Sequence, residues 1–226
     1  MELDKILKER RTVKKYFDKD VSWLAVSEVL DAGRMAPSSG NLQNWAFIVI
    51  RKKETRVNIL KHCEDASWAH KAPVLVVICA DLEKAKKNYG ERGLQYSIQN
   101  CACATMQMML KAYDLGLSTA WIASYNEKNL SKELDLDKNH VAMCVLALGH
   151  GETPHELNRH DLSTMVFFEK FGEKERKGDY AMLPLAVPMK RNVEPMKEKL
   201  KMAFENETAH GHKEKVKEFV KKFIKK

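Results

Sequence analysis

The sequence predicts an α+β fold built around a small central sheet, because strand-length apolar runs alternate irregularly with segments of helical periodicity. The clearest strand is the unbroken apolar run Val74–Ala80, which Pro73 introduces. The clearest helix runs from about Gln95 to Leu115 and ends at Gly116, a residue suited to a left-handed helix cap. No internal repeat is visible, and 226 residues are enough for one sizeable core.

The N-terminal part is expected to hold two helices followed by a polar loop. A short helix from Leu3 to Arg11 leads into a basic run. Ser22 can cap a second helix, from about Trp23 to Ala36, which stops at Pro37. Four residues are expected on one face of this second helix: Trp23, Val26, Leu30 and Gly33. The loop that follows is Pro37-Ser38-Ser39-Gly40-Asn41.

Strands and helices are expected to alternate through the rest of the fold. They are a strand Trp45–Arg51, a helix Glu54–His62, the strand Val74–Ala80, the long helix Gln95–Leu115, a strand Ser118–Ala123, a helix Leu130–Leu134 and a strand Val141–Leu148. The long helix is small and apolar nearly all round. We therefore expect it in the centre of the fold or in a dimer interface.

Composition favours a soluble, cytoplasmic protein. The chain begins Met1-Glu2-Leu3-Asp4, unlike a signal peptide, and its apolar runs are too short to span a membrane. The five cysteines are an odd number without a regular framework, so structural disulfides are not expected. They form no C-x-x-C pair, so a zinc or iron–sulfur site is not expected either. Cys101 and Cys103 are expected on different faces of the long helix.

The net charge of +8 belongs mainly to the tail. Residues 189–226 contain twelve Lys/Arg and six Glu, so the rest of the chain carries only about +2. Because no nucleic-acid-binding module accompanies these basic residues, nucleic acid is not an expected partner.

The end of the tail, Glu214–Lys226, is expected to form an amphipathic helix with an apolar stripe: Val216, Phe219, Val220, Phe223 and Ile224. The stripe would dock on the body of the protein or on a second subunit; binding to an anionic membrane surface is the alternative. His210 and His212 have too few companion ligands to predict a metal site.

Three segments carry candidate chemistry. The first places three cations and a hydroxyl at a helix-to-loop boundary, a set suited to phosphate: Arg10, Arg11, Thr12 and Lys14. The second, Pro37–Gln43, lets backbone groups approach a flat polar ligand. The third, Gly116–Ser124, carries Trp121 where a helix ends and a strand starts. Taken singly, each also fits a structural role: a solvated charge run, a connecting loop and a core tryptophan.

Taken together, in this order, the three segments resemble the nitroreductase family. Arg10–Phe17, with the sequence RRTVKKYF, is similar to the N-terminal signature of that family. Ala36–Trp45, with the sequence APSSGNLQNW, is similar to its A-P-S-S-x-N-x-Q-P-W signature. Lys71–Val74, Gly116–Ile122 and Leu146–Gly151 fit the family in the same order.

The resemblance implies a fold with a small, mostly antiparallel central sheet flanked by helices, an intertwined homodimer, and FMN held at the subunit interface. It implies an FMN-binding domain at residues 1–172. Residues 173–226 would be a basic C-terminal extension with a terminal amphipathic helix.

Roles for individual residues also follow from the resemblance. The FMN phosphate would be held by Arg10, Arg11, Thr12 and Arg159. The isoalloxazine ring would be flanked by residues from the partner subunit: Pro37, Ser38, Ser39 and Asn41. Backbone N–H groups of Ala123 and Ser124 would lie near flavin N5. Lys14 would lie near N1 and O2, where its charge would stabilise the negative charge of the reduced ring. Gln43 and Trp121 complete the expected cofactor-binding set.

The chain departs from the family pattern at two places. Asn44 replaces the usual proline before Trp45, which is expected to loosen that turn. Ala123-Ser124 stands where many relatives have glycines.

The implied function is an oxidoreductase that takes hydride from NADH or NADPH and reduces nitroaromatics, quinones or similar electron-poor acceptors by ping-pong turnover. One alternative is an FMN-binding or flavin-supplying protein without general reductase activity. Others are an interaction protein that uses its basic tail, and thiol redox chemistry through Cys101 and Cys103.

Overall fold

The computed structural model describes residues 2–154 and 159–173 and divides the chain into two compact units, Met1–Leu157 and Asn158–Lys226. The first unit contains six α-helices within its described residues: α1 (Leu3–Glu9), α2 (Trp23–Arg34), α3 (Lys53–Lys61), α4 (Leu82–Tyr89), α5 (Gly93–Asp114) and α6 (Glu127–Glu133). Its strands are β1 (Trp45–Ile50), β2 (Val74–Asp81), β3 (Ser118–Ile122) and β4 (His140–Gly149). Short 3-10 turns are η1 (Ser39–Asn41), η2 (Ser67–Lys71) and η3 (Gly90–Arg92).

The described part of the second unit contains a one-turn helix, α7 (Leu162–Met165). Asp161 caps it, because its carboxylate accepts a hydrogen bond from the Ser163 N–H at 3.0 Å. After the helix, the rings of Phe167 and Phe171 are in contact, with centroids 4.5 Å apart.

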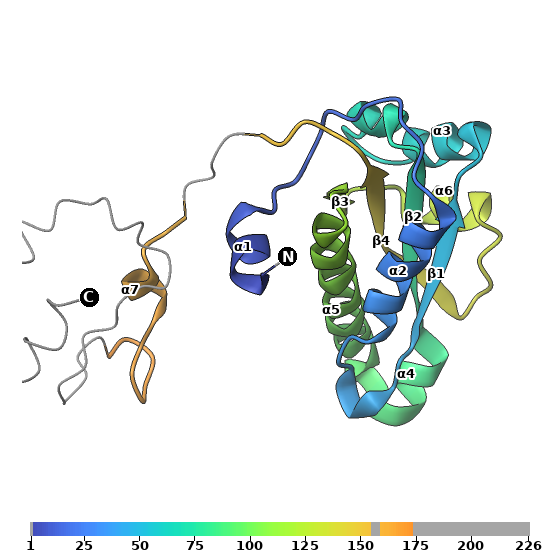
Figure 1. Cartoon of the computed structure of the whole chain (residues 1–226). Coiled ribbons are helices and arrows are strands. Elements are labelled where there is room, and N and C mark those ends of the chain that lie inside the picture. The colour runs from blue at the N-terminus through green and yellow to red at the C-terminus, as the bar shows by residue number, and fades with distance from the viewer. Residues whose placement is uncertain (1, 155–158, 174–226) are drawn as a thin grey trace, which may run out of the picture. The chain divides into compact units, whose positions relative to one another are not determined.

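Four antiparallel strands form one sheet in the order β1-β2-β4-β3 (Figure 1). The sheet therefore has β1 and β3 at its edges and β2 beside β4 in the middle. The α+β class and the antiparallel sheet predicted from the sequence are confirmed.

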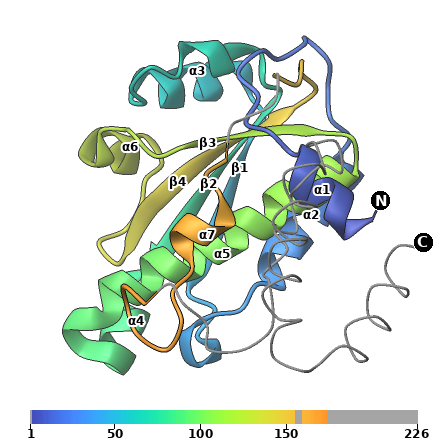
Figure 2. The same ribbon diagram turned by 90° about the vertical axis from the view of Figure 1, so that its left-hand side faces the viewer.

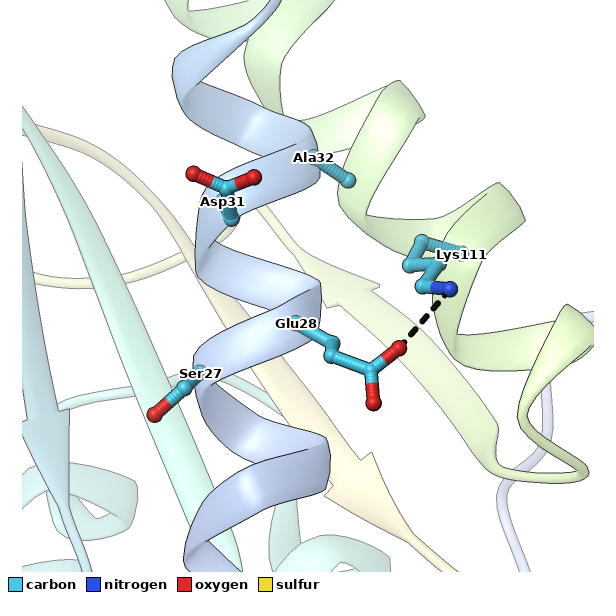
Figure 3. Close-up of a pocket in the computed structure, with 5 residues that line it drawn as sticks. All are labelled: Ser27, Glu28, Asp31, Ala32 and Lys111. Atoms are coloured by element: carbon cyan, nitrogen blue, oxygen red, sulfur yellow. Dashed lines mark ion pairs between the residues drawn. The ribbon is translucent and has the colours of Figure 1, made fainter.

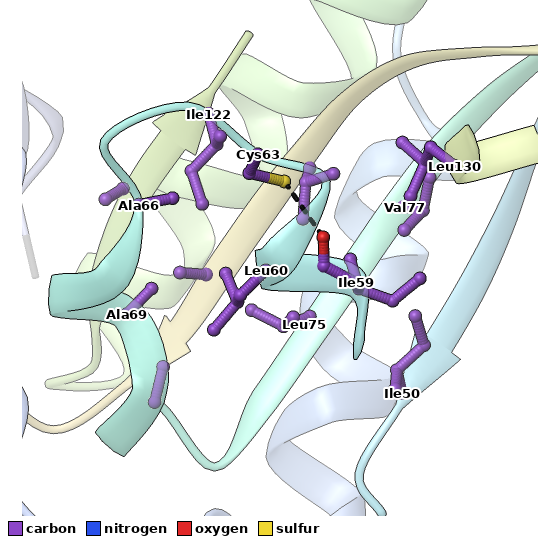
Figure 4. Close-up of a cluster of buried hydrophobic side chains, with 14 of the residues drawn as sticks. Ile50, Ile59, Leu60, Cys63, Ala66, Ala69, Leu75, Val77, Ile122 and Leu130 are labelled. Atoms are coloured by element: carbon purple, nitrogen blue, oxygen red, sulfur yellow. Dashed lines mark hydrogen bonds between the residues drawn. The ribbon is translucent and has the colours of Figure 1, made fainter. Parts of the chain in front are cut away.

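The central strand β2 is buried on both faces, which explains its unbroken apolar sequence. Leu75, Val77 and Cys79 point into a core with α3, η2 and α6, and Figure 4 shows part of this cluster. The alternate residues of the strand point into a second core with α2 and α5: Val74, Val76, Ile78 and Ala80. The sheet is thus covered by helices on both sides.

The long helix α5 lies across one face of the sheet, and α2 packs against it (Figures 1 and 2). Its C-terminal end has the geometry expected from the sequence. Gly116 has φ +72°, and the N–H of Leu117 donates back to the carbonyl of Ala112 at 2.8 Å. The helix buries one side against the sheet and α2, whereas Leu94 and Ile98 on another side are 53% and 52% exposed.

The second helix begins as expected. Ser22 caps α2, since its Oγ accepts from the Ala25 N–H at 3.2 Å. The buried residues are Val26, Val29 and Gly33, however, and Trp23 is 57% exposed. Val26, Leu30 and Gly33 of the expected face lie in or against the core, whereas Trp23 at the first helical position stays largely exposed. A Cβ at Gly33 would meet the side chain of Met108, so glycine allows the close approach of α2 and α5.

Sequence and structure also compare at one helix that was not predicted and at the C-terminal tail. Sequence reasoning missed helix α4, whose eight residues are mostly polar, although Leu82, Ala85 and Tyr89 stand at helical spacing after the cap residue Asp81. The expected amphipathic helix Glu214–Lys226 and the histidines His210 and His212 lie outside the described residues. Among the residues that are described, no helix combines the length and apolar character that a membrane crossing needs.

Candidate functional site

The segment Arg10–Phe17 lies beside β3 and the end of β4. Three backbone hydrogen bonds hold it there: Val13 N–H to Thr119 O (3.0 Å), Phe17 N–H to His150 O (2.8 Å) and Glu152 N–H to Lys15 O (2.9 Å). Thr12 also pairs with Thr119 as an isolated parallel bridge, and Tyr16 with Gly151 as an antiparallel one. The structure thus brings the basic segment next to the strand that carries Trp121.

Two glycines leave room for this segment at the end of β4. A Cβ at Gly151 would stand 2.6 Å from both the Lys15 carbonyl oxygen and Val13 Cγ1. A Cβ at Gly149 would stand 2.6 Å from Pro73 Cδ and 3.0 Å from the ring of Tyr16. The glycines of the Leu146–Gly151 segment are therefore needed because of close backbone approach.

Lys14 and Tyr16 lie on the same side of the segment, where both meet Trp68 of η2. The Lys14 ammonium stands 5.7 Å from the centroid of the Trp68 ring. The Tyr16 ring lies nearly parallel to that of Trp68, with centroids 6.4 Å apart and an interplanar angle of 14°. Thr12, two residues before Lys14, is exposed as well.

The two arginines at the start of the segment are half-buried. Arg10 is the C-terminal cap residue of α1. The Arg11 guanidinium donates to the carbonyls of Lys8 (2.6 Å) and Arg10 (3.0 Å) through one nitrogen, Nη1. Positive charge at a helix C-terminus is favourable. Because a guanidinium carries five N–H donors, Arg11 retains capacity for an anion. Arg159 is exposed and belongs to the second unit, so its role as a phosphate ligand stays a prediction.

The loop after α2 has an unusual backbone. Gly40, Asn41 and Gln43 have φ values of +54°, +56° and +48°. Such left-handed conformations are costly for residues other than glycine and persist only where surrounding contacts hold them. Here the Ser38 Oγ accepts from the Gln43 N–H at 3.0 Å, and the Gln43 amide donates to the side chain of Asn41 at 3.1 Å. The loop therefore presents a preformed surface, on which Pro37 and Asn41 are exposed.

A buried amide pair fastens this loop to α5. The Asn100 Oδ1 accepts from the N–H of Ser39 (2.9 Å) and from its hydroxyl (3.2 Å). The other end of the Asn100 amide donates to Asn44 Oδ1 at 2.9 Å, and Asn44 in turn donates to Ser97 Oγ at 2.8 Å. Asn44 is only 2% exposed. The expectation that Asn44 loosens the turn was wrong, since its side chain supplies contacts that a proline ring cannot make.

The end of β3 forms the third part of the site. Trp121 is half-buried in the strand, and Ala123 and Ser124 are exposed just after it. The Glu64 N–H donates to the Ser124 carbonyl at 2.9 Å, and the Ser124 hydroxyl donates to the Glu64 carboxylate. Within the described residues, no hydrogen bond from the N–H groups of Ala123 or Ser124 to another protein group is found. These two N–H groups are therefore available to a ligand.

One chain does not bring all three parts together. The loop is fastened to Asn100, whereas β3 begins beyond the last residue of α5, Asp114. The stretch of α5 between these points is roughly 20 Å long at 1.5 Å per residue. Figures 1 and 2 show the loop between α2 and β1 at the end of α5 near α4, and the segment after α1 at the other end.

Comparison with known proteins identifies the family. The family model described as Nitroreductase family matches residues 7–69 and 64–150, which is more than half of the chain. The chain belongs to the nitroreductase family. The matched residues include the basic segment, the polar loop and β3.

Relatives of this chain include proteins named for flavin and nicotinamide chemistry. An Archaeoglobus fulgidus protein provisionally named NADH dehydrogenase/NAD(P)H nitroreductase is 30% identical over 150 residues, 65% of this chain and 83% of the relative. FMN reductase [NAD(P)H] of Bacillus subtilis is 28% identical over 163 residues, 66% of each chain. The structure of an FMN-dependent nitroreductase from Clostridium difficile is 27% identical, with a TM-score of 0.63, and covers 74% of this chain and 98% of its own.

The positions of the cysteines argue against thiol redox chemistry in the described residues. Cys101 is buried and Cys103 is exposed, so the two lie on different faces of α5 as predicted. Burial raises the pKa of Cys101 and of Cys144 to about 12, which keeps both thiols protonated near neutral pH. A redox pair formed by Cys101 and Cys103 is therefore disfavoured by geometry and by ionisation.

A surface depression between α2 and α5 lies apart from the predicted site residues. Figure 3 shows its lining: Ser27, Glu28, Asp31, Ala32 and Lys111. The Lys111 ammonium lies 2.9 Å from the Glu28 carboxylate. This ion pair joins two packed helices at the surface, which is a structural role and does not indicate a catalytic site.

The sequence reasoning missed Trp68 and Asn100, which hold predicted site residues in place. An aromatic residue shortly before the Lys71-Ala72-Pro73 motif was the available signal for Trp68. No comparable signal marked Asn100, because the same helix carries other polar residues such as Gln99 and Gln107.

Proposed function

We propose that this chain is an FMN-dependent oxidoreductase that takes hydride from NADH or NADPH and reduces electron-poor organic acceptors, such as nitroaromatics or quinones, by ping-pong turnover. The proposal includes a homodimer in which each FMN site uses residues of both subunits. The arrangement of the segment Arg10–Phe17 beside β3 carries the proposal, and the names of the relatives support the cofactor and the electron donor.

The basic end of the site suits a phosphate group. Arg10 and Arg11 are half-buried cations, and the Thr12 hydroxyl follows them on an exposed part of the segment. Charge-assisted hydrogen bonds from guanidinium groups to phosphate oxygens are stronger than those between neutral groups. These three residues would hold the FMN phosphate, with Arg159 as a fourth ligand in the proposal.

The other end suits the ring system of a flavin. Ala123 and Ser124 offer backbone N–H groups that can donate to flavin N5, beside the half-buried Trp121. Lys14 would place its positive charge near N1 and O2. When bound, FMN supplies the redox chemistry by accepting hydride from the nicotinamide and passing electrons to the acceptor. The protein orients the ring and stabilises the charge that develops there.

The length of α5 supports the second subunit of the proposal. The loop that would flank the ring, with Pro37, Ser38, Ser39, Asn41 and Gln43, lies roughly 20 Å along α5 from the basic segment of its own chain. On α5, Leu94 and Ile98 are 53% and 52% exposed, and the half-buried Ala102 follows them at the same four-residue spacing. A second copy packed on these residues would cover them and would bring a second loop to the site.

The visible absorption spectrum of the purified protein tests the chemistry. FMN is added, unbound flavin is removed, and the spectrum is recorded anaerobically before and after NADH or NADPH. The expected result is a flavin spectrum that bleaches with at least one of the two donors and returns when a nitroaromatic or a quinone is added.

Other outcomes distinguish the alternatives. Flavin that binds, bleaches and then dissociates without reducing any organic acceptor would favour a flavin-supplying protein, a role that fits the relative named FMN reductase. A protein that stays colourless after FMN is supplied would overturn the proposal.

A further inference from the structure

We propose that Trp68 is a positioning residue for Lys14: its ring holds the Lys14 ammonium at the place where that charge acts on the bound flavin. This inference rests on the proposed function and adds a residue that lies outside the basic segment, the loop and β3. It is carried by the contact between Lys14, Trp68 and Tyr16.

The Trp68 ring is itself held firmly. Its side chain packs against the core between the sheet and α3, so only part of it is exposed. Tyr16 lies parallel to it at 6.4 Å and is only 3% exposed. The Tyr16 hydroxyl donates to the Ala147 carbonyl of β4 at 3.2 Å. The position of Trp68 is therefore fixed by the central sheet through two aromatic rings.

Lys14, in contrast, has a side chain that needs a support. It is exposed, and a lysine side chain has four rotatable carbon–carbon bonds, so an unsupported ammonium samples many positions. The Trp68 ring face offers it a cation–π contact at 5.7 Å from the centroid. The electrostatic attraction between two opposite charges weakens as their separation grows. An ammonium that is held close to a negative charge therefore stabilises that charge more than an ammonium that moves among many positions.

The neighbouring lysine cannot replace Lys14 in this role. The Lys15 ammonium lies 2.5 Å from the carboxylate of Glu152 and belongs to the opposite side of the extended segment. Its charge is thus paired with Glu152, whereas the ammonium over the Trp68 ring is that of Lys14. Of the two adjacent lysines, Lys14 is the one whose place depends on an aromatic platform.

The test compares the affinities for oxidised and for reduced FMN, since Lys14 is expected to favour the reduced form. We expect Trp68→Leu to lower the ratio of the affinity for reduced FMN to the affinity for oxidised FMN about two- to fivefold. This range corresponds to the energy of a cation–π contact at an exposed site. Trp68→Phe keeps an aromatic face and should retain most of the ratio. In a Lys14→Met background, Trp68→Leu should change the ratio no further, because the residue through which Trp68 acts is absent.

Two controls separate positioning from a general loss of structure. Trp23→Leu removes an exposed tryptophan of α2 and should leave the ratio unchanged. If Trp68→Leu does not fold, as judged by circular dichroism, Trp68→Met replaces it with a side chain of similar reach that lacks the aromatic face. Equal effects of the Trp68 substitution with and without Lys14 would overturn the inference while leaving the proposed function intact. A wild-type protein that binds no FMN would overturn both.

Discussion

Arg10 and Arg11 are adjacent in the sequence, yet their surroundings differ. Arg11 donates to two carbonyls at the end of α1 and so stabilises the helix as well as offering charge to a ligand. A substitution of Arg11 would therefore mix an effect on the helix with an effect on FMN. Arg10 forms the C-terminal cap of α1 through its backbone, and comparing FMN with riboflavin in an Arg10 variant separates phosphate binding from an effect on the helix.

Arg10→Ala should weaken FMN binding by about 1–3 kcal/mol, the scale of a charge-assisted hydrogen bond. The measurement is the dissociation constant for FMN, compared with that for riboflavin, which lacks the phosphate. The substitution should leave riboflavin binding unchanged. Arg34→Ala, which removes an exposed ion pair with Asp31 on α2, serves as the control. Unchanged FMN affinity in the Arg10 variant would remove this residue from the phosphate site.

The buried cysteines make stability depend on alkaline pH. Burial raises the pKa of Cys79 from 9.0 to about 11, so the folded state keeps a proton that the unfolded chain releases above pH 9. The contribution to stability is complete below pH 9 and is lost as the pH rises toward 11.

We expect the free energy of unfolding to fall between pH 9 and pH 11, and to fall less steeply in Cys79→Ala. Cys103→Ala should have the slope of the wild type, because this cysteine is exposed. Chemical denaturation at several pH values measures both slopes. Identical slopes in all three proteins would show that the Cys79 thiol does not contribute to this dependence.

At the scale of elements, the site depends on an extended segment held against two strands. Arg10–Phe17 gains its conformation from hydrogen bonds to Thr119 and His150, and the glycines at the end of β4 permit the approach. The basic residues are local in sequence, whereas the surface that orders them comes from residues more than a hundred positions later.

Gly151→Ala should displace this segment, because the new Cβ would stand 2.6 Å from the Lys15 carbonyl. We expect a loss of stability of about 1–3 kcal/mol from overpacking, together with weaker FMN binding. Thermal denaturation and FMN titration measure the two effects. Glu152→Ala, which removes only the exposed ion pair with Lys15, should change stability far less. An equal loss in both variants would argue against the steric explanation.

At the scale of the whole molecule, the proposed site requires two copies of the chain. The loop at Pro37–Gln43 and the basic segment lie at opposite ends of α5, and the helix between them is rigid. Defects in the two parts should therefore complement each other when two different variants share a dimer.

Arg10→Ala impairs the basic segment. Pro37→Trp places a large side chain at the exposed end of the loop, where it would block the proposed position of the isoalloxazine ring. Each variant alone should bind little FMN. After joint unfolding and refolding in equal amounts, about one quarter of the wild-type flavin content should return, because half of the dimers are mixed and each has one intact site. Refolding each variant alone is the control. No recovery in the mixture would show that one chain supplies the whole site.

The sequence by itself determined the class of fold, most elements and the residues with candidate chemistry, because apolar periodicity, caps such as Ser22 and Gly116, and ordered motifs are local signals. Tertiary structure decided what those signals cannot specify. It placed Trp68 under Lys14, fastened the polar loop to Asn100 and set that loop apart from the basic segment of its own chain. Such relations depend on which faces pack together, and packing joins residues that are distant in sequence through contacts that no short pattern encodes.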